Sequence, residues 1–311
     1  MLDPQAELAL QALATHNAQA GVNPSPAQLR ALYLSRRHFT EPAQEPVSLS
    51  RDHRLARGDS EIVVREIRPA QASADQVLPA LIYLHGGGWM VGSIDSHDGV
   101  CRALSNAAGC AVFSVDYRLA PEHRFPAAYD DALAAHAWLL KHAIELRIAP
   151  ERIAVAGDSA GGNLAAAACL GLRGQPNAPV FQLLIYPTIV MRTDTPSYQA
   201  HAEGRGLTRA GMAAYIQAYM GPDGQLDDWR ASPLLAPSLH SLPPALVLTA
   251  GFDPLRDDGL LYADALSAAG VPTQYLCFER QIHGFLLLGK IIAESRTAIE
   301  VCAAALRRAF S

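Results

Sequence analysis

The sequence predicts an α/β protein in which a mostly parallel β-sheet carries helices on both faces. Two observations support this prediction: short apolar runs recur along the chain, and helical segments separate them. Apolar runs of about four to eight residues without polar alternation are typical of strands buried on both faces. Strands that alternate with helices indicate βαβ units and a parallel sheet.

The first predicted strand, residues 61–68, alternates in polarity and suits an antiparallel position. The apolar runs that follow it are 78–84, 111–115, 153–156, 181–186, 245–250 and 273–278. Helices are predicted between and after these runs, at 127–147, 160–173, 257–269 and 290–309. The last strand is a candidate for a sheet edge, where a second copy could pair, so a monomer and a homodimer both stay open.

Two segments fall outside this alternation. The first fifty residues are predicted to be helical, with a capping box at 25–28 and Pro26 at the first helical position. Residues 188–240 exceed the length of a crossover helix and hold a helix-like stretch at 208–220. We interpret them as an insertion over the carboxyl edge of the sheet, where open α/β sheets bind ligands. The N-terminal helices, 1–55, and the insertion, 188–240, are expected to form a cap together. The α/β domain is expected in two parts, 56–187 and 241–311.

Composition narrows the class of protein. Half of the 311 residues are hydrophobic, 18% are charged and the net charge is −5. This composition is typical of a globular protein with a sizeable core. No Lys/Arg run marks a nucleic-acid or anionic-membrane surface. The chain shows no secretory signal and no stretch near ~18 consecutive apolar residues, so stable membrane insertion is not expected. Five scattered cysteines without C-x-x-C spacing favour reduced thiols in a cytoplasmic protein over disulfides or a zinc site.

The strongest local motif is Gly157-Asp158-Ser159-Ala160-Gly161, between an apolar strand and an Ala-rich helix. G-x-S-x-G in this context is the signature of a nucleophile elbow, a tight turn that holds a serine hydroxyl above the sheet. The pentapeptide alone also occurs by chance, so Ser159 is at this point a candidate nucleophile.

A second motif, His85-Gly86-Gly87-Gly88-Trp89, follows the strand at 78–84 directly. Consecutive glycines cost chain entropy, and a backbone that approaches a ligand closely would justify them. An HGGG-type loop supplies half of the oxyanion hole beside a nucleophile elbow. We therefore expect the N–H groups of Gly87, Gly88 and Ala160 to stabilise a developing oxyanion. The alternative, a phosphate-binding loop, lacks the required Lys-Ser/Thr or G-x-G-x-x-G pattern.

Among eleven histidines, His283 is the candidate base, because it follows the last predicted strand and precedes Gly284-Phe285. His85 is expected to shape the glycine loop rather than titrate. The other histidines considered are two in loops that could border the site and two inside a helical pattern, namely His97, His123, His136 and His142.

The candidate acid is Asp253, which follows the strand at 245–250. Asp257 and Asp258 compete with it, but both fall where a helix begins, and an N-cap or first-turn role explains them. The order Ser159, Asp253, His283 is that expected for a triad on this type of sheet, and it differs from the trypsin and subtilisin orders.

Five motifs together resemble the hormone-sensitive-lipase-like family of bacterial carboxylesterases, which have the α/β-hydrolase fold. Two of them are the motifs described above: His85–Trp89, and the elbow motif from Gly157, which here continues through Gly162 to Asn163. The other three are Asp116-Tyr117-Arg118-Leu119-Ala120-Pro121-Glu122, Asp253-Pro254-Leu255 and His283-Gly284-Phe285. The resemblance covers roughly residues 60–311, and Asp158 places the chain near the G-D-S-A-G branch.

The resemblance implies a serine esterase that cleaves small-molecule esters of short to medium acyl chain and needs no metal or organic cofactor. It also implies that Arg118 and Glu122 pair to brace the glycine loop. Three alternatives stay open from the sequence: amide cleavage or deacetylation on the same triad, a non-catalytic ligand receptor, and an interaction protein.

Overall fold

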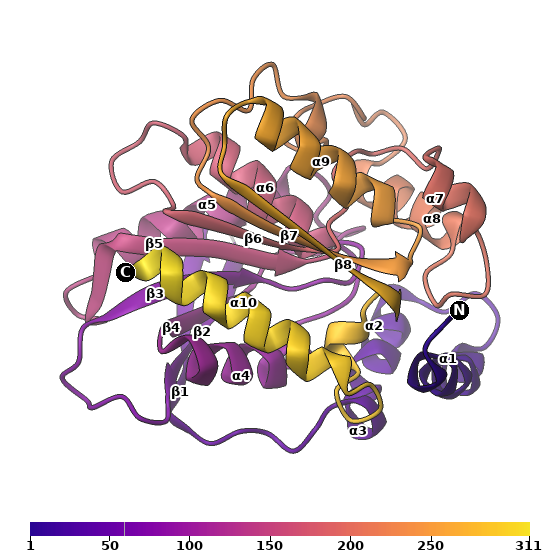
Figure 1. The fold of residues 1–311 in the computed structure, drawn as a ribbon, viewed down its shortest axis with the longest axis horizontal. Helices are drawn as coiled ribbons and strands as arrows, with labels where there is room; N and C mark the ends of the chain where they lie inside the picture. Colours follow the sequence, from indigo (N-terminus) through magenta and orange to yellow (C-terminus); the bar gives the residue numbers. More distant parts are fainter. Residues whose placement is uncertain (59) are drawn as a thin grey trace.

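The structure, a computed structural model, describes residues 1–58 and 60–311 and centres on one eight-stranded sheet in the order β1-β2-β4-β3-β5-β6-β7-β8 (Figure 1). The β1–β2 and β2–β4 pairs are antiparallel, and the other neighbouring strands are parallel. The strands are β1 (Val47–Arg57), β2 (Ser60–Pro69), β3 (Leu78–Leu84), β4 (Ala111–Asp116), β5 (Ile148–Asp158), β6 (Phe181–Ile185), β7 (Ala245–Phe252) and β8 (Thr273–Ile282). The predicted α/β class with a mostly parallel sheet is confirmed.

Helices cover both faces of this sheet. On one face α6 packs on β5 and β6, α5 packs on α6, and α9 packs on β7; on the other face α4 packs on β2 and β4 beside α10. The helices are α1 (Pro4–Asn17), η1 (Ala18–Ala20), α2 (Pro26–Ser35), α3 (Arg37–Thr40), α4 (Asp98–Ala108), α5 (Ala127–Lys141), α6 (Ala160–Leu172), α7 (Pro196–Ala200), α8 (Arg209–Met220), η2 (Pro233–Leu235), α9 (Arg256–Ala268), η3 (Phe285–Leu287) and α10 (Glu294–Phe310).

The apolar core therefore forms two layers, one on each side of the strands. Within β3 and β5 successive side chains enter opposite layers, because strand side chains alternate in direction. Ile82 and Leu84 lie in one layer, whereas Leu81 and Tyr83 lie in the other. This two-sided burial explains why the strands appear in the sequence as continuous apolar runs.

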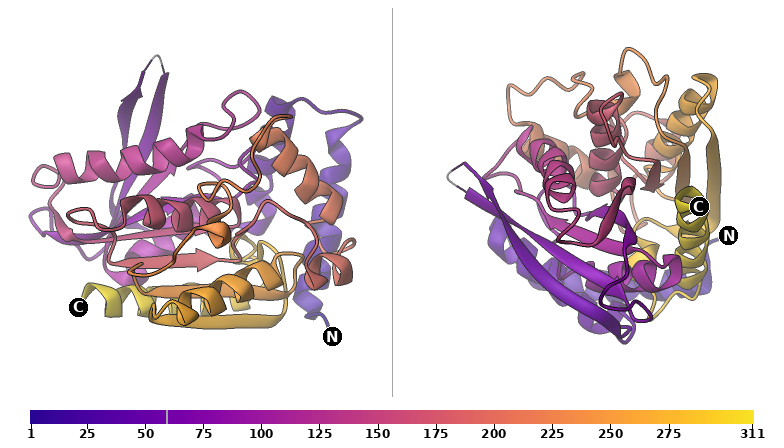
Figure 2. Two further views of the ribbon diagram at one scale, coloured as in Figure 1. Left: turned by 90° about the horizontal axis from the view of Figure 1, so that it is seen from above. Right: turned by 90° about the vertical axis from the view of Figure 1, so that its left-hand side faces the viewer.

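The elements missed by the sequence analysis lie where that apolar signal is weak. Strand β1 begins at Val47, inside the segment expected to be helical. It pairs on one side only, and polar or charged residues fill most of its exposed positions. Helix α4 was not predicted, although its buried face carries Val100 and Leu104. Helix α5 ends at Lys141 rather than at residue 147. In Figure 2 the β1–β2 hairpin projects from the body of the molecule.

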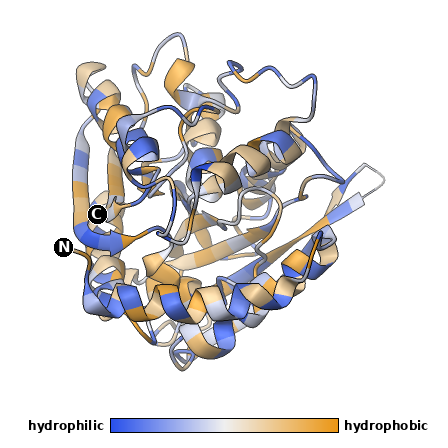
Figure 3. Ribbon diagram, turned by 90° about the vertical axis from the view of Figure 1, so that its right-hand side faces the viewer, coloured by the Kyte–Doolittle hydropathy of each residue, from blue (hydrophilic) through white to orange (hydrophobic). Residues whose placement is uncertain are grey.

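The parallel strands β3, β5, β7 and β8 bring their carboxyl ends to one edge of the sheet. Helices α1 and α2 and the insertion helices α7 and α8 gather at this edge (Figure 1). Figure 3 shows the molecule from that side: hydrophobic and hydrophilic segments alternate along the helices in front. The capping box of α2 is present, since Ser25 Oγ accepts from the Gln28 N–H and Gln28 Oε1 accepts from the Ser25 N–H. Among the helices of the described residues, none is both long and apolar enough to span a bilayer.

Candidate active site

Ser159 occupies a strained turn between β5, which ends at Asp158, and α6, which begins at Ala160. Its backbone dihedrals are φ 55° and ψ −118°, a conformation that a non-glycine residue adopts only under strain. The flanking glycines make the turn possible. A Cβ at Gly157 would lie 2.3 Å from the carbonyl carbon of Gly161, and a Cβ at Gly161 would lie 1.8 Å from Leu84 O. The elbow expected from the motif is present.

The structure brings the three predicted polar side chains into one hydrogen-bonded series. His283 Nδ1 lies 2.7 Å from Asp253 Oδ2, and His283 Nε2 lies 2.9 Å from Ser159 Oγ. The Asp253 carboxylate is fully buried and, when ionised, can only accept hydrogen bonds. The imidazole proton is therefore held on Nδ1, and Nε2 is free to accept from the serine hydroxyl. In this geometry His283 Nε2 can accept the hydroxyl proton of Ser159.

Asp253 and His283 are fixed by further contacts. The second carboxylate oxygen of Asp253 accepts from the N–H of Leu255, at the start of α9, at 2.8 Å. The ring of Tyr186 packs against the imidazole of His283 with centroids 4.8 Å apart. Both residues follow the ends of adjacent parallel strands, β7 and β8, so the sheet itself sets their separation.

The glycine loop faces Ser159 across a common cavity that Gly87, Gly88, Ser159 and His283 all line. Gly87 and Gly88 take φ values of 123° and 59°, which favour glycine. Within the described chain neither amide donates to a backbone carbonyl. Ala160 is the first residue of α6, where helical N–H groups lack intrahelical acceptors. These three N–H groups are thus available, and their role as oxyanion donors stays a prediction.

Asp158 connects the elbow to the glycine loop. Its Oδ1 accepts from the Tyr83 hydroxyl at 2.9 Å and from the Gly86 N–H at 3.0 Å, and it lies 3.2 Å from His97 Nε2. All of these side chains are buried. Burial alone would raise the pKa of Asp158, but the neighbouring His97 and the hydrogen bonds outweigh it and lower that pKa. The sequence analysis treated Asp158 only as a mark of resemblance, and its contacts come from residues remote in sequence.

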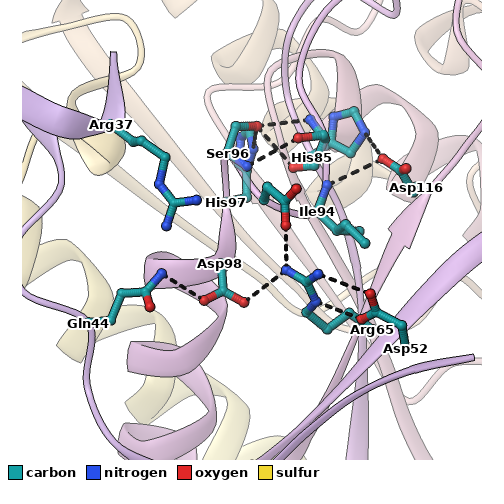
Figure 4. A network of polar contacts seen from close by, with 12 residues as sticks. Arg37, Gln44, Asp52, Arg65, His85, Ile94, Ser96, His97, Asp98 and Asp116 are labelled. Atoms are coloured by element: carbon teal, nitrogen blue, oxygen red, sulfur yellow. Dashed lines mark hydrogen bonds and ion pairs between the residues drawn. The ribbon is translucent and has the colours of Figure 1, made fainter. Parts of the chain in front are cut away.

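Figure 4 shows a polar network around His85, His97 and Arg65. His85 packs flat on Tyr117 and faces Asp116, and its Nδ1–H donates to Gly86 O at 2.9 Å. Burial lowers the pKa of His85 to about 3, so this imidazole is neutral at ordinary pH. The expectation that His85 shapes its loop rather than titrates agrees with these contacts.

Farther out, Arg65 from β2 bonds to Asp52 Oδ1 at 2.7 Å, to Asp95 at 2.8 Å and to Asp98 at 3.3 Å (Figure 4). Asp98 opens α4 directly after His97. The ion-pair network therefore anchors the backbone that carries His97 beneath the glycine loop.

The predicted Arg118–Glu122 pair is wrong. Arg118 binds the buried Asp131 from α5, with Nη2 2.8 Å from Oδ1. Glu122 instead pairs with Arg30 from α2 at 2.6 Å. Sequence proximity favoured the local pair, whereas the fold offers each side chain a partner from another element. Arg30 is the residue that braces the glycine loop, because it also donates to Met90 O and Ala120 O at 3.0 and 2.9 Å.

The other histidines considered lie outside the reaction cavity. His97, expected in a loop that could border the site, is buried beneath the glycine loop. His123 is exposed and does not line the cavity. His136 is buried in α5 with Nε2 3.0 Å from Asn177 O. His142 is half-buried and caps the end of α5, with Nδ1 2.9 Å from Trp138 O.

The two competing aspartates lie in the first turn of α9 and do not contact His283 within the described residues. Asp257 Oδ2 accepts from the Ser197 N–H at 2.8 Å, and Asp258 Oδ2 accepts from the Ile189 N–H at 3.2 Å. The first-turn position is confirmed; the N-cap position belongs to Leu255, which has no capping side chain. Both carboxylates hold the start of the insertion in place.

The cavity has a volume of about 630 Å³, which suits a small-molecule substrate. Side chains of α2, α8 and the segment after β8 line it together with the glycine loop. Sequence analysis assigned none of the α2 and α8 residues to its walls. In the part of the chain that the structure describes, no group of His, Cys, Asp or Glu has a metal-binding arrangement.

A strained serine at a strand-to-helix turn, hydrogen-bonded to a histidine that a buried aspartate orients, is the arrangement of a serine hydrolase. A family defined by the alpha/beta hydrolase fold matches residues 81–287. The chain is 39% identical to carboxylesterase NlhH of Mycobacterium tuberculosis, over 99% of this chain and 96% of that protein. It is also 39% identical to an ethyl acetate hydrolase of Pseudomonas putida, over 88% of this chain and 89% of that protein.

Solved structures agree with these relatives. An ester hydrolase from the Lake Arreo metagenome, solved with a phosphonate derivative, superposes with a TM-score of 0.93 at 40% identity and covers 100% of this chain and 99% of its own. The carboxylesterase EstE1 from a metagenomic library gives a TM-score of 0.89 at 40% identity, and the match covers 94% of this chain and 99% of EstE1. The chain belongs to the α/β-hydrolase family, in its hormone-sensitive-lipase-like branch, as the motifs predicted.

Proposed function

We propose that the protein hydrolyses carboxylic esters of short to medium acyl chain through an acyl-enzyme on Ser159. The observation that carries the proposal is the series Asp253–His283–Ser159 at 2.7 and 2.9 Å, at the wall of a cavity of small-molecule size. The relatives named as carboxylesterases and ester hydrolases support the same reaction class.

In the first half-reaction His283 Nε2 accepts the hydroxyl proton of Ser159 while Oγ attacks the ester carbonyl carbon. The carbonyl π electrons move to the oxygen and form a tetrahedral oxyanion. When the C–O bond to the alcohol breaks, Nε2–H protonates the leaving alkoxide, and an acyl-Ser159 ester remains. Asp253 keeps the other ring nitrogen protonated and stabilises the imidazolium.

In the second half-reaction water replaces the alcohol. His283 takes a proton from water, the hydroxide oxygen attacks the acyl carbon, and Ser159 leaves with the proton returned by the imidazolium. The products are the carboxylic acid and free enzyme. These steps use side chains of the protein and water alone.

The oxyanion of both tetrahedral intermediates is assigned to the N–H groups of Gly87, Gly88 and Ala160. Support comes from the available amides on opposite sides of Ser159 and from the start of α6, whose N-terminal dipole favours negative charge. One donor of such a hole contributes roughly 2.7–4 kcal/mol to the barrier.

The helices of residues 1–55 and the insertion 188–240 are proposed to act together as the cap that selects the substrate, over an α/β domain formed by 56–187 and 241–311. Residues 47–55 of the first range lie in β1 and belong to the sheet. Cavity-lining residues from both α2 and α8 support this assignment. The five free thiols favour a reducing, cytoplasmic setting. Strand β8 lies at the sheet edge and leaves pairing of two copies open alongside a monomer.

An acyl-length series of p-nitrophenyl esters, measured on wild type and on Ser159→Ala, tests the function. Wild type should favour short to medium chains, and Ser159→Ala should lose about 10⁴–10⁶-fold in kcat. Ser267→Ala, at an exposed position of α9, is the matched control and should behave as wild type. Matched anilides measure amide cleavage. Turnover by Ser159→Ala comparable to wild type would reject the proposal.

A further inference from the structure

One positive charge in the wall of the reaction cavity has no carboxylate partner. Three arginines line the cavity. Arg37 pairs with Glu41 at 2.8 Å, and Arg296 pairs with Glu300 at 3.2 Å. Arg36 lies within ion-pair distance of no carboxylate among residues 1–58 and 60–311. A cation that lines a ligand cavity without an internal counter-ion is suited to an anionic group of the ligand.

The Arg36 guanidinium is nonetheless held in a defined place. Its Nη2 donates to Asn17 Oδ1 at 2.8 Å, and its Cζ lies 4.8 Å from the centre of the Tyr33 ring. Nε is buried without a hydrogen-bond partner, so the neutral contacts do not satisfy this group fully. A fixed planar guanidinium loses little conformational entropy when it binds an oxyanion.

Two phenols complete a polar cluster with Arg36. Tyr33 from α2 and Tyr215 from α8 also line the cavity, and neither hydroxyl makes a hydrogen bond within the described chain. Burial raises the pKa of both phenols, although the nearby Arg36 acts in the opposite direction, so both stay protonated donors at neutral pH. Arg36, Tyr33 and Tyr215 are called the donor cluster below.

The donor cluster lies on the same wall as the glycine loop. A Cβ at Gly88 would lie 2.4 Å from Cγ of Tyr215, so the Tyr215 ring rests directly on that glycine. The Tyr33 ring stacks beside His97, which lies beneath the loop, with centroids 6.5 Å apart. A group bound by these donors would therefore belong to the same ester whose carbonyl reaches Ser159.

The carboxylates of the cavity form no ion pair with the donor cluster among the described residues. Glu41 and Glu300 have their own arginines. Glu45 accepts from the side-chain amide of Asn106 at 2.9 Å, and Asp158 lies 3.2 Å from His97 Nε2, so neither forms an ion pair with Arg36. Among the described residues, Arg36 is therefore the arginine of the cavity wall that has no carboxylate within ion-pair distance.

We propose that the donor cluster binds a carboxylate carried by the substrate at a distance from the scissile ester, so that the preferred substrates are esters with a second, free acid group. A guanidinium and two phenolic O–H groups all donate and match the acceptor-only carboxylate. This proposal rests on the ester hydrolysis proposed above and adds the substrate class.

The test compares each carboxylate ester with its methyl-terminated isostere. One series holds monomethyl esters of glutaric, adipic and pimelic acids against methyl esters of matched fatty acids. A second series places the carboxylate on the alcohol side, as acetates of ω-hydroxy acids against alkyl acetates. The measured quantity is the ratio of kcat/KM for the charged ester to that for its isostere, in wild type and variants.

In wild type the ratio should exceed one for at least one chain length. Arg36→Gln should lower that ratio at least tenfold, and Tyr33→Phe and Tyr215→Phe should each lower it severalfold. If Arg36→Gln folds poorly, the tyrosine variants still test the proposal. Neither tyrosine hydroxyl makes a hydrogen bond within the described chain, so its removal should leave the fold intact. Arg209→Gln, exposed at the start of α8, is the matched control and should leave the ratio unchanged.

A wild-type ratio of one or less in both series, or a ratio that survives in all three variants, overturns the proposal. A ratio lowered equally by Arg209→Gln also overturns it, because that result indicates general electrostatic attraction. Hydrolysis of the neutral isosteres by wild type reports separately on the proposed function. Loss of that hydrolysis would count against the esterase proposal, whereas its persistence without charge preference would count against the donor cluster alone.

Discussion

The carboxylate of Asp158 accepts the backbone N–H of Gly86 at 3.0 Å, so the residue before Ser159 is hydrogen-bonded to the first glycine of the loop that faces it. Asp158 is the last residue of β5 and Gly86 follows β3, and these two strands are neighbours in the sheet. A Cβ at Gly86 would lie 2.4 Å from Asp158 Oδ2, which shows how closely the segments approach. This contact sets the spacing between the serine and the expected oxyanion donors.

Asp158→Ala should lower kcat about 10²-fold with little change in KM, because the glycine loop loses its tie to the elbow and a displaced donor contributes only in the transition state. Asp158→Asn should stay within about tenfold of wild type. Its amide oxygen can still accept from the Tyr83 hydroxyl and the Gly86 N–H, the two bonds that Asp158 Oδ1 makes. Steady-state kinetics on one p-nitrophenyl ester measures both.

The Asn variant separates position from charge. If Asp158 acted through its negative charge on the His283 imidazolium, Asp158→Asn would lose as much activity as Asp158→Ala and would shift the pH–rate profile. Asp264→Asn, exposed on α9, controls for a change of net charge. Equal losses in both Asp158 variants would contradict a positioning role.

Gly88→Ala should lower kcat/KM at least about 10²-fold. The new Cβ would meet the Tyr215 ring 2.4 Å from Cγ, close to the backbone of α8, so the ring cannot swing aside and the loop must move. Gly109→Ala is the matched control, because Gly109 has a similar φ of 69° and nothing within 4 Å of the added Cβ. Both variants should lose roughly 1–2 kcal/mol of stability from the left-handed backbone. Only Gly88→Ala should lose activity, and equal activity in the two variants would count against the loop's proposed role.

The sequence was sufficient for seven of the eight strands, all but β1, and for the Ser159–His283–Asp253 geometry, because both depend on short-range signals. Apolar runs mark strands buried on both faces, and parallel strands bring their carboxyl ends to one edge, so residues that follow different strands meet there. The elbow is also visible in the sequence, because its tight turn requires glycine at 157 and 161, where an added Cβ would collide with backbone atoms.

Pairings between distant elements could not be predicted in the same way. Arg118 was assigned to Glu122, four residues away, but it binds Asp131 on α5, and Glu122 binds Arg30 on α2. The arrangement of Tyr33 and Arg36 beside Tyr215 likewise joins two segments far apart in the chain. Helical periodicity can locate α2 and α8, but which of their faces lines the cavity depends on how they cross the sheet edge.

Asp253→Asn should lower kcat about 10⁴-fold while the fold is kept. An amide at this position can donate to His283 Nδ1, which places the imidazole proton on Nε2 and leaves no acceptor for the Ser159 hydroxyl. Asp257→Asn is the matched control four residues along, since its carboxylate contacts the Ser197 backbone and not the imidazole. Saturation kinetics on a short-chain ester checks this. A loss below tenfold for Asp253→Asn would show that another group orients the base.

Asp258→Asn should stabilise the protein, and increasingly so as pH rises. Asp258 is fully buried, and burial together with the nearby Asp253 charge raises its pKa well above the ordinary value, so the folded protein keeps it protonated. Below an unfolded-state pKa of about 3.9 both states bind the proton and no linkage arises. Above it the unfolded chain ionises while the folded chain must hold the proton, so the free energy of unfolding falls with increasing pH until the folded-state pKa is reached.

Asparagine removes that proton linkage. Its side-chain oxygen can still accept from the Ile189 N–H, the bond that Asp258 Oδ2 makes at 3.2 Å. The difference in Tm between Asp258→Asn and wild type should therefore be near zero at about pH 4 and should grow through pH 8, as thermal unfolding across this range would show. Asp264→Asn, exposed on the same helix, should give a difference that does not depend on pH. A Tm difference between Asp258→Asn and wild type that narrows with rising pH would contradict this. It would mean that Asp258 is ionised in the folded protein and that the Ile189 N–H stabilises its buried charge.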